Sequence, residues 1–239
     1  MINLVNLAIT HAEKIDFSDT LFTEEVALLV KDDGQVPANN ISPAIASFNG
    51  KRIGVNTGTV HAEIVKEVLP KAEVFYFDSL ANLLGALTAG KVEAIAHDDS
   101  TILAFEHDNP SLKHIDDYLQ TFDNAFILAK TPKADRLRSE LDEFIRSLKA
   151  DGTLQKIREV WLGFDDSVKT LPDYKNYPDT NGTLKIAADG ETHPYTYIKD
   201  GRLVGYDVDV ITRFCKAKGY RPEFSEMNFS SIISAVQSG

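Results

Sequence analysis

Short runs of β-branched and aromatic residues alternate along this chain with runs of helical period, and this alternation constrains the fold more than any other feature. Strand-like runs occupy residues 2–9, 25–30, 52–55, 73–77, 94–97, 125–129, 183–188 and 221–225. Helix-like runs occupy residues 61–69, 79–88, 133–150, 154–161, 206–218 and 230–237. Strands that alternate with helices are typical of open, mostly parallel sheets with helices packed on their faces. We therefore expect an α/β fold.

Residues 165–182 interrupt this alternation. Their sequence, DDSVKTLPDYKNYPDTNG, contains two prolines and several Asp, Asn and Tyr residues, with neither helical nor strand periodicity. This composition indicates a linker. An extended chain spans up to about 3.3–3.6 Å per residue, so the segment is long enough to join elements that are distant in space.

Composition and charge exclude several classes of protein. The net charge of the 239 residues is −11 and acids and bases are mixed along the chain, so we expect no nucleic-acid partner. Apolar runs such as residues 26–30 are far shorter than the roughly 20 residues that cross a bilayer. The first ten residues alternate like a strand and lack a basic start, so we expect that any export signal has been removed. The single cysteine, Cys215, cannot form an internal disulfide, and we expect it in the core.

Residues 182–210 carry the first of an ordered series of motifs. They read GTLKIAADGETHPYTY from Gly182 and GRLVGYDVDV from Gly201. This segment resembles the start of bacterial extracellular solute-binding proteins of family 3, the amino-acid-binding kind. In that family a first strand ends in an acidic loop and a Pro-aromatic pair, and a Gly-aromatic-Asp-x-Asp helix start follows.

The family's other segments follow in rotated order. Residues 226–239 resemble its next segment, which is also where the chain ends. The strand, I-T turn and F-S-D motif that come next in the family stand at the opposite end, as residues 2–8, 9–10 and 17–19. The resemblance continues through residues 50–59, 87–98, 150–157 and 161–163, so it covers nearly the whole chain.

The resemblance implies a two-lobed, type II periplasmic-binding-protein-like fold, circularly permuted, in which each lobe is an open, mostly parallel sheet flanked by helices. Lobe 1 would comprise residues 1–29 and 130–239, including the linker 165–182, and lobe 2 residues 30–129. Two origins fit the rotation: a circular permutation, or a fragment cut across the junction of two tandem binding domains. Either origin supplies each family segment once, so we expect a monomer or a domain-swapped dimer.

Ligands in open α/β sheets bind at the carboxyl ends of strands, and the candidate site residues lie there. The resemblance implies that Asp98 holds a ligand ammonium group, with His97 beside it. Thr59 and Val60 open a helix whose N–H groups would take a ligand carboxylate. The complete set of expected ligand-binding residues is Ala8, Thr10, Thr57, Gly58, Thr59, Val60, His97, Asp98, Asp189, Tyr195 and Phe229.

The roles of the last three residues come from the same resemblance. Tyr195 and Phe229 would sandwich the apolar part of the ligand, with Asp189 bonding its polar end. Other interpretations stay open, because Asp189 could simply hold a turn before Gly190 and Phe229 could belong to the core.

Two departures from the family pattern stand out. After Thr10 the family usually has an arginine that clamps the ligand carboxylate, whereas this segment is shorter and has only Lys14, which is not equivalent. Thr192 stands where the family often has an aromatic residue.

A metal site is a further interpretation of the histidine-rich and acidic region of lobe 2. It contains His97, Asp98, Asp99, His107 and His114, but their spacing matches no closed ligand set. We expect no metal and no cofactor.

The leading functional hypothesis is a binding protein, not an enzyme, that holds an amino-acid-like solute in an interlobe cleft and delivers it to an ABC transporter permease. The alternatives are an enzyme on the same scaffold, of the cyclic amino-acid dehydratase or lytic kind, and the sensing domain of a receptor. An enzyme would need an acid or base in the cleft, and Asp189 with His97 is the pair we can nominate. A periplasmic or extracellular location follows only from the resemblance.

Overall fold

The computed structural model describes residues 2–6, 15–32 and 45–238 and divides the chain into two compact units. Unit 1 comprises Met1–Phe22 and Asn124–Gly239, and unit 2 comprises Thr23–Asp123. The chain passes between the units inside strands β3 (Phe22–Lys31) and β7 (Leu112–Ala129). The sequence analysis places the boundaries between the lobes at 29/30 and 129/130. Periodicity gives no signal at 22/23 and 123/124, because β3 and β7 each continue from one unit into the other.

Unit 1 is built on strands in the order β12-β8-β1-β7, with β2 (Ile15–Phe17) also paired to β7. Strands β8 (Thr183–Ala188) and β12 (Arg221–Glu226) run parallel, and so do β8 and β1 (Ile2–Asn6). Strand β7 is antiparallel to β1 and to β2. The central strands therefore have neighbours on both sides and can carry helices on both faces.

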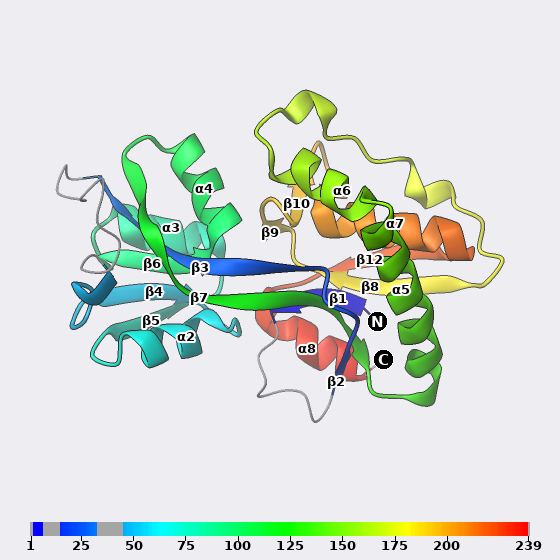
Figure 1. Ribbon diagram of the computed structural model, residues 1–239, viewed down its shortest axis with the longest axis horizontal. Coiled ribbons are helices and arrows are strands. Elements are labelled where there is room, and N and C mark those ends of the chain that lie inside the picture. Colours follow the sequence, from blue (N-terminus) through cyan, green and yellow to red (C-terminus); the bar gives the residue numbers. More distant parts are fainter. Residues whose placement is uncertain (1, 7–14, 33–44, 239) are drawn as a thin grey trace. The chain divides into compact units, whose positions relative to one another are not determined.

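Helices cover both faces of this sheet (Figure 1). Leu184 and Ile186 of β8 point into a core shared with α5 (Pro132–Ala150), α6 (Thr153–Leu162) and α7 (Tyr206–Lys218). Ala187, the residue between Ile186 and Ala188, packs on the other face with Ile232 of α8 (Phe229–Ser238). Each fully buried large apolar side chain stabilises the fold by roughly 1.5–3 kcal/mol.

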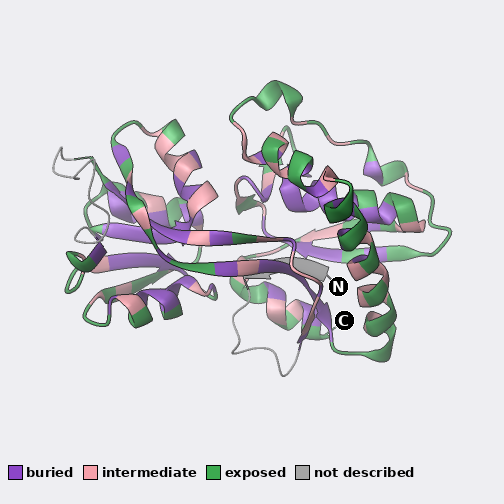
Figure 2. Ribbon diagram, viewed as in Figure 1, coloured by how far each residue is buried: buried purple, intermediate pink, exposed green. Residues whose placement is uncertain are grey.

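Unit 2 has the strand order β7-β3-β6-β4-β5, and its inner strands are buried on both faces (Figure 2). Strand β4 (Arg52–Asn56) runs parallel to β5 (Glu73–Phe77) and β6 (Ala94–Asp98), whereas β3 is antiparallel to β6. Helix α2 (His61–Val68) covers one face, and α3 (Leu80–Thr88) and α4 (Asp99–Asp108) cover the other. The α/β fold class is thus confirmed.

The segment expected to be a linker packs on unit 1. It contains two short 3₁₀ helices, η2 (Asp166–Val168) and η3 (Tyr174–Asn176). Tyr174 is buried, and its hydroxyl donates a hydrogen bond to the carbonyl of Leu203 at 3.2 Å. Leu203 belongs to a small sheet of β9 (Glu191–Thr192), β10 (Thr196–Lys199) and β11 (Arg202–Val204), which the sequence analysis did not predict.

Cys215 lies in the core of unit 1, and burial raises the pKa of its thiol to about 12. Because the thiolate is the reactive form, we expect iodoacetamide to leave Cys215 unmodified in the native protein and to modify it fully after unfolding in urea. Mass spectrometry of the intact chain measures the modification, with a cysteine-containing peptide as the reference for an accessible thiol. Modification of the native chain at the peptide's rate would contradict the burial of Cys215.

Candidate functional site

In unit 2, a turn after β4 leads directly into α2. Gly58 has φ +85°, and the Thr59 hydroxyl donates a hydrogen bond to the carbonyl of Asn56 at 2.9 Å. Val60 precedes the helix and its side chain makes no capping hydrogen bond. The expected residues Thr57, Gly58, Thr59 and Val60 thus form one turn at the amino end of α2, where backbone N–H groups favour an anion.

The end of β6 places two of the expected residues beside this helix. His97 and Asp98 are both buried, and the Asp98 carboxylate Oδ1 lies 2.8 Å from Nε2 of His61, the first residue of α2. The rings of His61 and His97 have centroids 4.5 Å apart. The sequence analysis did not single out His61, because one histidine at a helix start carries no signal until β4 and β6 pair and bring the helix to Asp98.

Burial controls the charge of His97. It lowers the pKa of this imidazole to about 3, against a smaller opposing effect of Asp98, while His61 adds to the lowering. His97 is therefore neutral at neutral pH. Its Nδ1 accepts a hydrogen bond from the backbone N–H of Asp98 at 2.8 Å, which identifies Nδ1 as the unprotonated nitrogen.

In unit 1, Asp189 follows β8 and bonds to its own loop. Its Oδ1 accepts hydrogen bonds from the N–H of Glu191 at 2.7 Å and of Thr192 at 3.1 Å, and its Oδ2 accepts one from the Thr192 hydroxyl at 2.7 Å. Burial raises the pKa of Asp189, and these hydrogen bonds oppose the rise. This geometry is that of a turn-holding residue, the second interpretation given to Asp189 above.

The two aromatic residues expected in the site lie in different surroundings. Tyr195 is buried in the core of unit 1 and stacks on Phe22, with ring centroids 5.7 Å apart and planes 10° apart. Phe229, the first residue of α8, is half-buried and packs against the core on the other face of the sheet. Ala8 and Thr10 lie outside the described residues.

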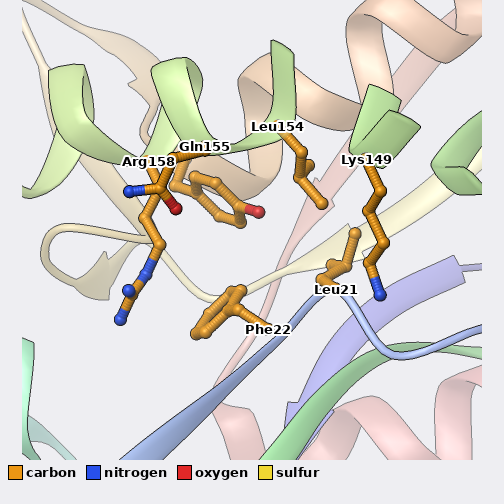
Figure 3. A pocket seen from close by; sticks show the side chains of 7 residues that line it. Leu21, Phe22, Lys149, Leu154, Gln155 and Arg158 are labelled. Carbon is orange, nitrogen blue, oxygen red and sulfur yellow. The ribbon is translucent and has the colours of Figure 1, made fainter. Parts of the chain in front are cut away.

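A hollow in unit 1 was not anticipated from the sequence (Figure 3). Leu154 and Lys149 extend from the helices toward Leu21 and Phe22. The Arg158 guanidinium lies 5.0 Å from the centre of the Phe22 ring, and the Lys149 ammonium donates a hydrogen bond to the carbonyl of Thr20. Both cations therefore contact unit 1 at the first residue of β3 or just before it.

Comparison with known proteins decides the family. The sequence profile of bacterial extracellular solute-binding proteins, family 3, matches residues 3–164 and 184–239. The chain belongs to this family. Residues 165–183, which lie between the two matched stretches, include η2 and η3.

Two curated proteins and a solved structure are also similar to this chain. ABC transporter arginine-binding protein 1 of Escherichia coli K12 is 24% identical over 63% of this chain and 60% of its own length. The histidine-binding periplasmic protein of Salmonella typhimurium is 27% identical over 64% of this chain and 60% of its own length. An amino acid ABC transporter substrate-binding protein of Streptococcus pneumoniae, solved with L-arginine, has a TM-score of 0.56 at 23% identity, covering 64% of this chain and 65% of that one.

This family 3 chain spans about 60% of the length of the curated relatives it matches. Among the described residues, the structure contains no helix long and apolar enough to cross a membrane.

Proposed function

We propose that this family 3 protein binds a small, polar, amino-acid-like solute and delivers it to an ABC transporter. One observation carries the proposal: a buried carboxylate, Asp98, adjoins the amino end of α2, since His61 of that helix contacts it at 2.8 Å. A carboxylate attracts an ammonium group, and the amino end of a helix attracts a carboxylate. An α-amino acid carries an ammonium and a carboxylate group on the same carbon, so it complements both features.

The properties of His97 and Asp189, the candidate acid and base groups, favour binding over catalysis. The His97 imidazole, with a pKa of about 3, is a poor base near neutral pH, where an efficient catalytic base has a pKa close to the working pH. The Asp189 carboxylate is engaged by its own loop.

A periplasmic or extracellular location and a permease partner follow from the named relatives and are part of the proposal. The permuted order, and the choice between a monomer and a swapped dimer, stay predictions.

The test is a thermal-shift screen against amino acids, small carboxylates, amines and short peptides, followed by calorimetry on any solute that stabilises the protein. A solute at 100 times its Kd should add about 2.7 kcal/mol to the free energy of unfolding. Asp98→Asn should weaken binding about 10- to 100-fold, because a hydrogen bond to a charged group contributes about 1.5–3 kcal/mol.

Asp108→Asn is the matched control, because His107-Asp108 repeats the His-Asp pair of residues 97 and 98 on an exposed part of unit 2. Its affinity should equal that of the wild type. Circular dichroism must show that both variants are folded. A folded wild-type protein that no solute stabilises, or an Asp98→Asn variant with unchanged affinity, would contradict the proposal.

A further inference from the structure

Two imidazoles and one carboxylate converge in unit 2. One ligand atom from each of His61, His97 and Asp98 lies within 4.8 Å of the other two. All three side chains are buried, with exposed fractions of 0%, 3% and 5%. They come from the first residue of α2 and the last two residues of β6, elements whose positions are fixed by the pairing of β6 with β4 and by the packing of α2 on the sheet.

This set of donors suits a particular class of ion. Neutral imidazole nitrogens and carboxylate oxygens are ligands of divalent transition metals, whereas Mg²⁺ and Ca²⁺ prefer oxygen alone. An imidazole must be unprotonated at the coordinating nitrogen, and Nδ1 of His97 meets this condition because it accepts a hydrogen bond from the N–H of Asp98. The Asp98 carboxylate would offset one of the two positive charges of the ion.

We propose that His61, His97 and Asp98 form a binding site for a divalent transition-metal ion such as Zn²⁺. This departs from the expectation of no metal, which rested on sequence spacings that did not include His61. In a tetrahedral zinc site with bonds of about 2.0–2.2 Å, neighbouring ligand atoms lie about 3.4 Å apart. The separations here are 2.8 Å between His61 Nε2 and Asp98 Oδ1 and 3.6 Å between His97 Nδ1 and Asp98 Oδ2. These two separations involve different oxygens of Asp98 and lie on either side of 3.4 Å, and all three side chains have a ligand atom within 4.8 Å of the others. Side-chain rotation would have to bring one carboxylate oxygen and both imidazole nitrogens onto a common ion.

Binding would exchange existing contacts for metal bonds. The ion would take the place of the hydrogen that lies between His61 Nε2 and Asp98, and His61 would stay neutral by carrying its proton on Nδ1 instead. The ion would also displace the N–H of Asp98 from His97 Nδ1. Three protein ligands leave the fourth position of a tetrahedral ion open to water or another small donor. The affinity of the site is thus set by the difference between these hydrogen bonds and the metal bonds.

The test is calorimetric titration of the EDTA-treated full chain with Zn²⁺ and a parallel titration with Co²⁺ followed by visible absorption. We expect one ion per chain and the absorption bands of tetrahedral Co²⁺. His61→Gln and His97→Gln should each weaken binding at least about 10-fold, and more if the lost ligand is not replaced. The controls His107→Gln and His114→Gln, which remove the other described histidines of unit 2, should bind like the wild type.

X-ray absorption at the zinc edge of the wild-type protein keeps the test independent of whether variants fold. Two imidazole ligands and no sulfur ligand are expected. No binding to the wild type, fewer than two imidazoles, or unchanged affinity in folded His61→Gln and His97→Gln would show that the cluster is only a hydrogen-bonded part of the core. Asp98 serves in both proposals, so the solute screen is run on the EDTA-treated chain and the metal titrations contain no solute, which keeps the two outcomes distinguishable.

Discussion

Gly205→Ala should lower the free energy of unfolding by at least about 3 kcal/mol. Gly205 precedes α7 with φ +130° and ψ 177°, a conformation that side-chain-bearing residues essentially do not adopt. A Cβ atom there would lie 2.0 Å from the carbonyl oxygen of Tyr195 and 2.9 Å from that of Pro194. These are backbone atoms, so either the 194–195 loop or the start of α7 must move. Urea unfolding followed by the fluorescence of the single tryptophan, Trp161, measures the loss in unit 1.

Gly152→Ala is the matched control. Gly152 also precedes a helix, α6, with a positive φ of 74°, but nothing lies within 4 Å of an added Cβ. Gly152→Ala should lower the free energy of unfolding by only about 1–2 kcal/mol, the strain of a residue with a side chain in the left-handed conformation. Equal losses for the two variants would show that backbone conformation alone, without the contact to Tyr195, determines the effect.

Local signals predicted the helices well. The expected helix 133–150 is α5 (Pro132–Ala150), and the expected helix 206–218 is α7 (Tyr206–Lys218). Thr131 caps α5 by accepting a hydrogen bond from the N–H of Ala134, and Gly219 ends α7 in the left-handed conformation. Capping involves neighbouring residues only, so it can be inferred from the sequence.

Strand β7 shows where local signals fail. Only residues 125–129 were predicted as a strand, but β7 extends over Leu112–Ala129. The buried apolar residues of its first part are Leu112, Ile115, Leu119 and Phe122. Spacings of three and four do not indicate a strand, in which side chains alternate with period two. Pairing with β3 determines this conformation, and that pairing is not visible in a window of neighbouring residues.

The same distinction between local signals and long-range contacts applies to the candidate site. Asp98, His97 and the turn 57–60 could be nominated because each belongs to a contiguous motif. His61 could not, because its contact with Asp98 joins residues 37 positions apart. The sequence left two interpretations of Asp189 open, and only the three-dimensional structure shows that three hydrogen-bond donors of its own loop surround it.

Trp161→Ala should lower the free energy of unfolding by about 3–5 kcal/mol, the usual cost of removing a large aromatic side chain from a core. Trp161 is 1% exposed in the core of unit 1, between α5, α7 and the sheet. Its indole Nε1 also donates a hydrogen bond at 2.9 Å to Oδ2 of Asp209, a buried carboxylate whose Oδ1 accepts a hydrogen bond from Nε of Arg213 at 2.5 Å. The substitution therefore leaves both a cavity and a carboxylate oxygen with one donor fewer. Urea unfolding followed by circular dichroism measures the change, since the fluorophore is lost.

Trp161→Phe separates the two contributions. It keeps most of the apolar volume and removes the indole N–H, so it should cost less than Trp161→Ala but more than the about 0.5–1.5 kcal/mol of an ordinary hydrogen bond. Phe164→Ala is the control for loss of an aromatic side chain near the end of α6, because Phe164 is 55% exposed and should cost less than about 1 kcal/mol. If Trp161→Phe were as stable as the wild type, the bond to Asp209 would contribute nothing net. The stability of unit 1 at this point would then depend on packing alone, with Arg213 sufficient to compensate the buried charge.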